Sequence, residues 1–316
     1  PTRPCPTRPN PPTPHARRAV PVSAVRRAIR PCRLLSRLAR NEIRAALILP
    51  DGGVVASTRW GVFAAGAGDD RFSPSRLPAS LGPIYPPMAL CLGSEDRILW
   101  GEYGSNPHRR VVRIFASTDG GRSFDPVYEF PAGEIRHVHN IQADPFERGY
   151  WVFVGDHGRE QGIGRLSADL RRVEWVARGG QICRTVSAFL LADRLVYGTD
   201  TEVELNYLCA LDRKTGRIQT LGRLPGSSMY AARFGEWLVL STTVEYNRHE
   251  PSRDSTLWVS RDGSAWQQVY AARKDLWSRR YFQYGSIILP RRSWDRPEIL
   301  FGGQAVRIRN ATDRDD

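Results

Sequence analysis

The sequence repeats one pattern of short alternating apolar segments four times between residues 88 and 270. Each copy contains four strand-length pieces with turn residues between them, and successive copies begin about 45 to 50 residues apart. The first copy consists of Met88–Gly93, Arg97–Gly101, Val111–Ser117 and Phe124–Phe130. Four strands per repeat at this period are typical of a β-propeller, in which each repeat forms one blade. A β-sandwich would explain the short strands but not the fixed period.

Less regular segments flank the four repeats. Residues 45–72 resemble one further blade, and residues 284–309 supply three more strand-like pieces but no outer strand. The segment Ile29–Leu38 is a candidate for the missing strand, closing the ring from the N-terminal side. We therefore expect an all-β propeller domain over residues 41–310 with six four-stranded blades. Five blades are the main alternative, if the terminal pieces merge.

The positive charge of the chain is concentrated at its N-terminal end. The formal net charge is +13, but residues 1–44 carry eleven Arg against Glu42, so they account for +10 and the remaining 272 residues for only +3. Residues 1–40 are rich in Pro and Arg, and we expect them to be disordered, with a short polar tail at residues 311–316. A basic tail by itself supplies only non-specific attraction to phosphates. The composition therefore does not predict a nucleic-acid partner.

Three other features of the sequence bear on the kind of protein and on where it is located. Apolar runs fall short of the roughly 20 residues that cross a bilayer, so we expect no membrane partner. The five cysteines lack the spacing of a disulfide framework or a zinc knuckle. The sequence contains no recognisable secretory signal and does not begin with Met, so localisation stays open. Oligomeric state is open as well.

Turn motifs between the third and fourth strands suggest a family. Residues 117–124 read STDGGRSF, residues 260–266 read SRDGSAW, and Ser167, Asp169 and Trp175 form a degenerate third copy. In such a turn the Asp carboxylate can accept backbone amides and the Gly can take a positive φ. The pattern resembles the Asp box of the sialidase-like (BNR) propellers, in architecture over residues 45–309 but in diagnostic motifs over about twenty residues. In that family the boxes lie away from the active site, so the resemblance implies structural roles for Asp119 and Asp262.

Alignment of the blades predicts where an axial site would form. The loops that leave the second strands converge on the axis of a propeller, and four of them carry an acid. These acids are Glu102, Asp156, Asp200 and Glu245. A second set leads into the innermost strands and consists of His137, His139, Arg184, Tyr230 and Tyr284. Polar residues are common in turns, but two chemical types at two aligned positions indicate a central acidic pocket with a basic and phenolic rim.

The sialidase resemblance implies carbohydrate chemistry, and paired carboxylates suit glycoside hydrolysis of an oligo- or polysaccharide. We expect Asp156 and Asp200 to be the catalytic pair, with Glu102 and Glu245 in reserve, while the second set of residues binds the sugar. Glu202 and Glu204 follow Asp200 along the chain, and either one of them is a further candidate acid. Trp60, Tyr103 and Tyr207 are candidates to stack on sugar rings.

Departures from the sialidase pattern keep two alternatives open. The family's early Arg-Ile-Pro motif is missing, and Tyr284 with Glu245 is only a loose match to its Tyr–Glu nucleophile. A polysaccharide lyase would use His139 and Tyr230 as acid and base, with Arg184 or a metal on the uronate carboxylate. A non-catalytic propeller would bind glycan or protein on the same face.

The two histidines allow a further alternative. His137 and His139 flank Val138 at the start of a predicted strand, so they point to one face, and Asp156 lies on the next strand. A divalent metal near His137, His139 and Asp156 is conceivable. We favour the alternative in which one imidazole binds a loop carbonyl and the other contacts ligand, so the sequence predicts no cofactor.

Overall fold

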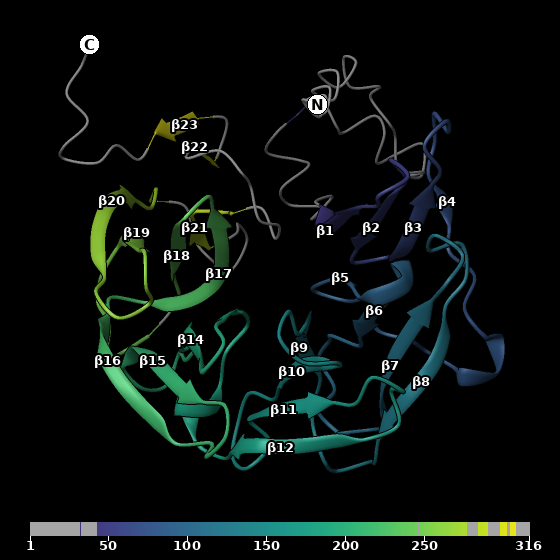
Figure 1. The fold of residues 1–316 in the computed structure, drawn as a ribbon, viewed down its shortest axis with the longest axis horizontal. Helices are drawn as coiled ribbons and strands as arrows, with labels where there is room; N and C mark the ends of the chain where they lie inside the picture. The colour runs from purple at the N-terminus through teal and green to yellow at the C-terminus, as the bar shows by residue number, and fades with distance from the viewer. Residues whose placement is uncertain are drawn as a thin grey trace, which may run out of the picture.

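A computed structural model describes residue 32 and residues 43–245, 247–276, 284–289, 298–301 and 304–307. Within these residues five antiparallel sheets follow one another around a central axis as the blades of a propeller (Figure 1). Each blade has four strands in sequence, one blade gains a short fifth strand, and two further strands pair only with each other among the described residues. In each blade the strands pair in chain order, and the first strand is the innermost.

The blades have the following bounds. Blade 1 contains β1 (Ile43–Ile48), β2 (Val54–Thr58), β3 (Gly61–Ala65) and β4 (Ser73–Pro74). Blade 2 contains β5 (Cys91–Leu92), β6 (Ile98–Gly101), β7 (Val112–Ser117) and β8 (Asp125–Phe130). Blade 3 contains β9 (Val138–Ala143), β10 (Tyr150–Val154), β11 (Gly162–Leu166) and β12 (Val173–Arg178). Blade 4 contains β13 (Ala188–Leu190), β14 (Arg194–Gly198), β15 (Asn206–Asp212) and β16 (Ile218–Leu224). Blade 5 contains β17 (Ser227–Phe234), β18 (Trp237–Val244), β19 (Asp254–Ser260) and β20 (Gln267–Arg273).

Six shorter elements complete the description. Three are 3₁₀ turns, namely η1 (Ala79–Leu81), η2 (Ser94–Asp96) and η3 (Gln181–Cys183). The others are the strands β21 (Gly285–Ser286), β22 (Glu298–Phe301) and β23 (Gln304–Arg307). The part of the chain that the structure describes contains no helix long and apolar enough to cross a membrane.

The four sequence repeats correspond to blades 2 to 5, and the less regular N-terminal unit is blade 1. The leading expectation of six blades is wrong: the described residues support five, the alternative count. β19 pairs with β18 only as far as Ser241, so Thr243 and Val244 remain available and pair with β21. β21 therefore extends blade 5 instead of starting a sixth blade. The segment Ile29–Leu38 and both predicted tails lie outside the described residues, Cys32 excepted.

Apolar side chains fill the spaces between neighbouring blades. All five residues of β10, with the sequence YWVFV, are buried. Val152 packs with residues of blade 2 and Trp151 with residues of blade 4. A strand covered on both faces has no reason to alternate apolar and polar residues. The continuous apolar runs of the second strands thus follow from stacking between blades.

The Asp boxes close the turns between third and fourth strands. Asp119 accepts hydrogen bonds from the amide and hydroxyl of Ser123, while Phe124 is buried behind the turn. Asp262 accepts the amides of Ser264 and Ala265. A similar turn, not apparent from the motif, lies in blade 4, where Asp212 accepts the amides of residues 214 and 215. That turn lacks the Ser and the aromatic residue that define the box.

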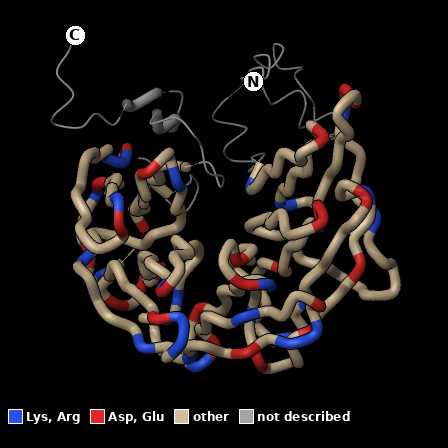
Figure 2. The backbone as a smooth tube through the Cα atoms, in the orientation of Figure 1, with Lys and Arg blue, Asp and Glu red and all other residues tan. Residues whose placement is uncertain are grey.

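Charge is spread evenly over the folded part of the chain. Figure 2 shows acidic and basic positions interspersed around the described blades. This agrees with the near-neutral balance of the sequence after residue 44.

Candidate functional site

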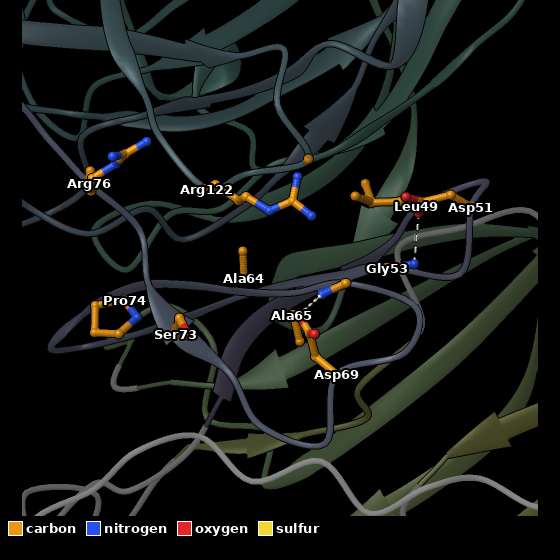
Figure 3. A pocket seen from close by; sticks show the side chains of 12 residues that line it. Leu49, Asp51, Gly53, Ala64, Ala65, Asp69, Ser73, Pro74, Arg76 and Arg122 are labelled. Atoms are coloured by element: carbon orange, nitrogen blue, oxygen red, sulfur yellow. Dashed lines mark hydrogen bonds between the residues drawn. The ribbon is translucent and has the colours of Figure 1, made fainter.

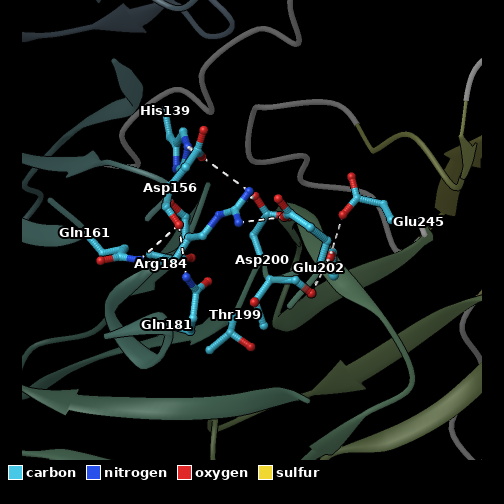
Figure 4. Close-up of polar contacts among 12 residues, drawn as sticks. His139, Asp156, Gln161, Gln181, Arg184, Thr199, Asp200, Glu202 and Glu245 are labelled. Atoms are coloured by element: carbon cyan, nitrogen blue, oxygen red, sulfur yellow. Dashed lines mark hydrogen bonds and ion pairs between the residues drawn. The ribbon is translucent and has the colours of Figure 1, made fainter. Parts of the chain in front are cut away.

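Three carboxylates contact one buried guanidinium group near the axis (Figure 4). Arg184, which directly follows η3, lies with Nη2 3.2 Å from Asp156 Oδ1 and Nη1 2.6 Å from Glu202 Oε2. Its Nε lies 3.8 Å from Asp200 Oδ2. The alignment of blades predicted that these loops converge, and the structure brings Asp156, Asp200 and Arg184 together. Glu202 joins them from the same loop as Asp200.

A buried network fixes the loop that carries Asp156. Gly155 has a φ of 81°, and a Cβ there would lie 2.5 Å from the backbone of Glu160, so only glycine fits. Glu160 accepts the amide of His157 at 3.0 Å. Gln161 and Gln181 each donate a side-chain N–H to the carbonyl of Asp156, at 2.9 and 3.0 Å. Blade alignment did not find these supporting residues, because they lie outside the repeated strands.

The two histidines face the carboxylate of Asp156 from β9 and the residue before it. His139 Nε2 lies 3.1 Å from Asp156 Oδ1, and His137 Nε2 lies 3.3 Å from Asp156 Oδ2. The two Nε2 atoms lie 3.0 Å apart. Both Nδ1 atoms bind loop carbonyls, those of Gly104 and Thr185. The sequence predicted such a bond for one histidine, and the structure shows it for both.

Burial opposes ionisation of Asp200 and Glu245. Asp200 is 3% exposed, and burial raises the pKa of its carboxyl although Arg184 opposes the effect. Glu245 directly follows β18 and accepts a hydrogen bond from Ser227 Oγ at 2.7 Å. Burial and the nearby charge of Asp200 raise the pKa of Glu245 to about 8. Figure 4 shows Glu245 to the right of the carboxylates around Arg184.

Asp156 has the opposite electrostatic environment. Burial alone would raise its pKa, but the contacts with His137 and His139 outweigh it and hold the pKa well below its usual range. One cluster thus contains carboxyl groups whose pKa values are pushed in opposite directions.

The remaining three predicted site residues are Glu102, Tyr230 and Tyr284, and each has different surroundings in the structure. Glu102 is 3% exposed and accepts the amides of Tyr85 and Arg113, at 3.0 and 2.9 Å, so both oxygens bind the backbone. Tyr230 packs against the apolar cluster of blade 5. Tyr284 is 50% exposed and precedes β21. The catalytic or binding roles assigned to them stay predictions.

Among the aromatic candidates, Tyr103 lies beside the histidines. The centroid of its ring is 4.5 Å from that of His137 and 6.0 Å from that of His139. Burial, followed by the charge of Asp156, raises the pKa of its phenol. Trp60 lies at an exposed turn of blade 1, under Arg59, and Tyr207 lies in β15. Tyr103 is therefore the aromatic side chain that the structure joins to the site.

A separate cavity of about 270 Å³ lies between the outer turns of blades 1 and 2 (Figure 3). Its lining includes Arg76 and Arg122 together with Asp51 and Asp69. The two carboxylates accept backbone amides of their own turns, those of Gly53 and Gly66. These acids therefore stabilise the turns that line the cavity.

Comparison with known proteins supports the fold and no narrower class. No family model and no curated protein matches the chain. Among solved structures, an oligogalacturonate lyase in complex with manganese matches with a TM-score of 0.52 and 12% identity, covering 81% of this chain and 72% of that one. A putative TolB from Agrobacterium tumefaciens matches with a TM-score of 0.50 and 9% identity, covering 73% and 82%. At such identity the likeness shows a β-propeller, and the sialidase resemblance is supported only to that extent.

Proposed function

We propose that the axial cluster hydrolyses glycosidic bonds of an oligo- or polysaccharide, with Glu245 as the general acid and Glu202 as the carboxylate that acts on the opposite side of the bond. The observation that carries this proposal is the difference between the two groups. Glu202 is ion-paired with Arg184, whereas the hydrogen-bond partner of Glu245 is the hydroxyl of Ser227. Glycoside hydrolysis needs one protonated and one ionised carboxyl group in a single site.

The protonation states suit these roles. With a pKa of about 8, Glu245 carries its proton at neutral pH and can donate it to the departing glycosidic oxygen. Burial is the largest cause of this rise in pKa, and the charge of Asp200 adds to it. The Glu202 carboxylate can then attack the anomeric carbon or remove a proton from an attacking water. Its side chain is 36% exposed, so a substrate can reach it.

The proposal moves catalysis away from the pair that the sequence favoured. Asp156 already contacts His137, His139 and Arg184, which leaves its carboxylate little freedom to transfer a proton. Asp200 has a side chain only 5% exposed, so it is better placed to bias Glu245 than to touch a sugar. We assign both residues to the framework of the site.

The alternative reaction is cleavage of the glycosidic bond by elimination, as in a polysaccharide lyase. The matched lyase is described as acting on oligogalacturonate with manganese. Against a similar role here, the guanidinium of Arg184 is engaged by three carboxylates and is not available to neutralise a uronate. Arg184 was one of the two cations considered for that role in the lyase hypothesis, and a metal was the other.

The test uses neutral, uronate-containing and sialylated glycans with the wild-type protein and with Glu245→Gln. New reducing ends without ultraviolet-absorbing unsaturated product are expected, and Glu245→Gln should lower the rate at least about 100-fold. Glu236→Gln is a matched control, because Glu236 lies at an exposed turn of the same blade and pairs with Arg261. Unsaturated product would establish a lyase instead. Silence of both signals, with retained glycan binding, would indicate a binding propeller.

A further inference from the structure

We infer that His137, His139 and Asp156 form a binding site for one divalent transition-metal ion such as Zn²⁺ or Mn²⁺. The ligand atoms are the two Nε2 atoms and a carboxylate oxygen, and they all lie within 4.8 Å of one another. Each imidazole is at least nine-tenths buried, with exposures of 5% for His137 and 2% for His139. The ligands of this site are residues other than Glu245 and Glu202, although Arg184 contacts both Asp156 and Glu202, and the inference does not depend on the hydrolytic role proposed for those two residues.

The hydrogen bonds at Nδ1 determine which histidine atoms are free. His137 Nδ1 lies 3.0 Å from the carbonyl of Gly104, and His139 Nδ1 lies 3.0 Å from the carbonyl of Thr185. A carbonyl oxygen only accepts, so each Nδ1 carries the proton. In the neutral imidazoles both Nε2 atoms therefore present lone pairs. Histidine ligands of metals typically donate the other ring N–H to a carbonyl in this way.

The lone pairs of the two Nε2 atoms then face each other and the carboxylate of Asp156, so these contacts need either a proton or a metal cation between them. The Nε2 atoms are 3.0 Å apart, and each lies 3.1 or 3.3 Å from an oxygen of Asp156. A single proton on His139 Nε2 can be shared between His137 Nε2 and Asp156 Oδ1, but the contact of 3.3 Å between His137 Nε2 and Asp156 Oδ2 then has none. Two added protons would place two imidazolium N–H groups against each other at 3.0 Å. A metal cation at the centre can bind both Nε2 atoms and one carboxylate oxygen of Asp156 at once.

The spacing also suits one ion. Ligands about 2.1 Å from a metal lie about 3.0 to 3.4 Å apart when the bond angles are between about 90° and 109°. The two Nε2 atoms are 3.0 Å apart, and they lie 3.1 and 3.3 Å from Oδ1 and Oδ2 of Asp156, respectively, which falls in this range. Two imidazoles and one carboxylate favour transition metals over Ca²⁺ or Mg²⁺, which prefer oxygen ligands only. Three carboxylates share the single charge of Arg184, so the surroundings favour additional positive charge. Asp156 keeps 16% of its side chain exposed, so water or ligand oxygen can complete the coordination.

The test is calorimetric titration of the full-length, tag-free protein after treatment with a chelator. One Zn²⁺ per chain should bind, Ca²⁺ should bind far more weakly, and His139→Ala should weaken Zn²⁺ binding more than about 100-fold. His108→Ala is the matched control, since His108 is exposed in the loop after β6. Circular dichroism checks that each variant is folded.

Two further measurements make the test independent of the alanine variant. Asp156→Asn keeps the shape of the side chain but removes its charge, and it should weaken Zn²⁺ binding at least about 10-fold. The wild-type protein loaded with Co²⁺ should show visible absorption bands of a nitrogen- and oxygen-ligated ion. Absence of Zn²⁺ binding to the wild type, equal affinity for Ca²⁺, or unchanged affinity in the folded His139→Ala variant would overturn the inference. None of these outcomes depends on whether glycans are hydrolysed.

Discussion

Replacement of Glu245 by Gln should change how the stability of the propeller depends on pH. The substitution removes the ionisable carboxyl but keeps an oxygen that can accept the hydrogen bond from Ser227. The pKa of Glu245 rises from an ordinary value of 4.5 in the unfolded chain to about 8 in the folded protein. Between these two values the folded state binds more protons than the unfolded state. The free energy of unfolding therefore falls as pH rises through this window.

The magnitude follows from linkage. One pKa unit corresponds to about 1.4 kcal/mol, so the full difference sets an upper bound of about 5 kcal/mol. Glu245 is only half-buried by accessible area and keeps part of its hydration, so we expect about 2 kcal/mol. The charged groups that act on it are Asp200, Glu202 and Arg184. The pKa of Asp200 is raised as well, so Asp200 also makes the free energy of unfolding fall as pH rises. The effect of Glu245 is therefore read from the difference between the pH profiles of the wild-type protein and Glu245→Gln.

The assay is urea unfolding of the wild-type protein and Glu245→Gln at pH 5, 7 and 8.5, followed by tryptophan fluorescence. The wild type should lose about 2 kcal/mol more than the variant between the lowest and the highest pH. Glu236→Gln should follow the wild type. Parallel pH profiles for the wild type and Glu245→Gln would refute the argument that burial and Asp200 hold this carboxyl protonated.

Three other substitutions test the framework of the site. Arg184→Met removes the cation shared by three buried or half-buried carboxylates and should cost about 3 to 5 kcal/mol in urea unfolding; a loss below about 1 kcal/mol would show that the ion pairs are weakly coupled to folding. Gly155→Ala forces a Cβ into the backbone of Glu160 at a positive φ and should cost about 1 to 3 kcal/mol in the same assay; an unchanged midpoint would contradict the tight turn. Asp119→Ala removes acceptors for Ser117 and Ser123 and should lower stability by about 1 to 3 kcal/mol in a thermal melt, without lowering any hydrolytic rate; loss of activity in a stably folded variant would contradict a purely structural box.

The propeller was predictable because every blade needs the same pattern of apolar residues in its strands. A second strand such as β10 is covered on both faces, so its apolar run stands out wherever it recurs. The number of blades depended on a tertiary contact instead. Nothing local to residues 284–289 shows that two of them pair with the unpaired end of β18. The turn at Asp212 was missed because its hydrogen bonds form without the full motif.

The site was predictable as a set of converging loops but not as a set of contacts. Blade alignment placed Asp156, Asp200, His139 and Arg184 at one end of the propeller, and the structure shows them in contact or close by. Blade alignment gave Glu102 the position equivalent to Asp156 and Asp200, but in the structure the carboxylate of Glu102 accepts two backbone amides. Such choices depend on distances of a few ångströms between loops, which strand spacing does not encode.

The most direct test of a catalytic axial cluster is the pH dependence of reducing-end release by the wild-type protein, measured on the most responsive glycan of the panel and compared with Glu245→Gln. The account predicts a wild-type rate that declines above about pH 8, as Glu245 loses its proton. Glu245→Gln should be at least about 100-fold slower and should lack this decline. A variant with the wild-type rate and the wild-type pH profile would contradict the assignment of Glu245 as the general acid.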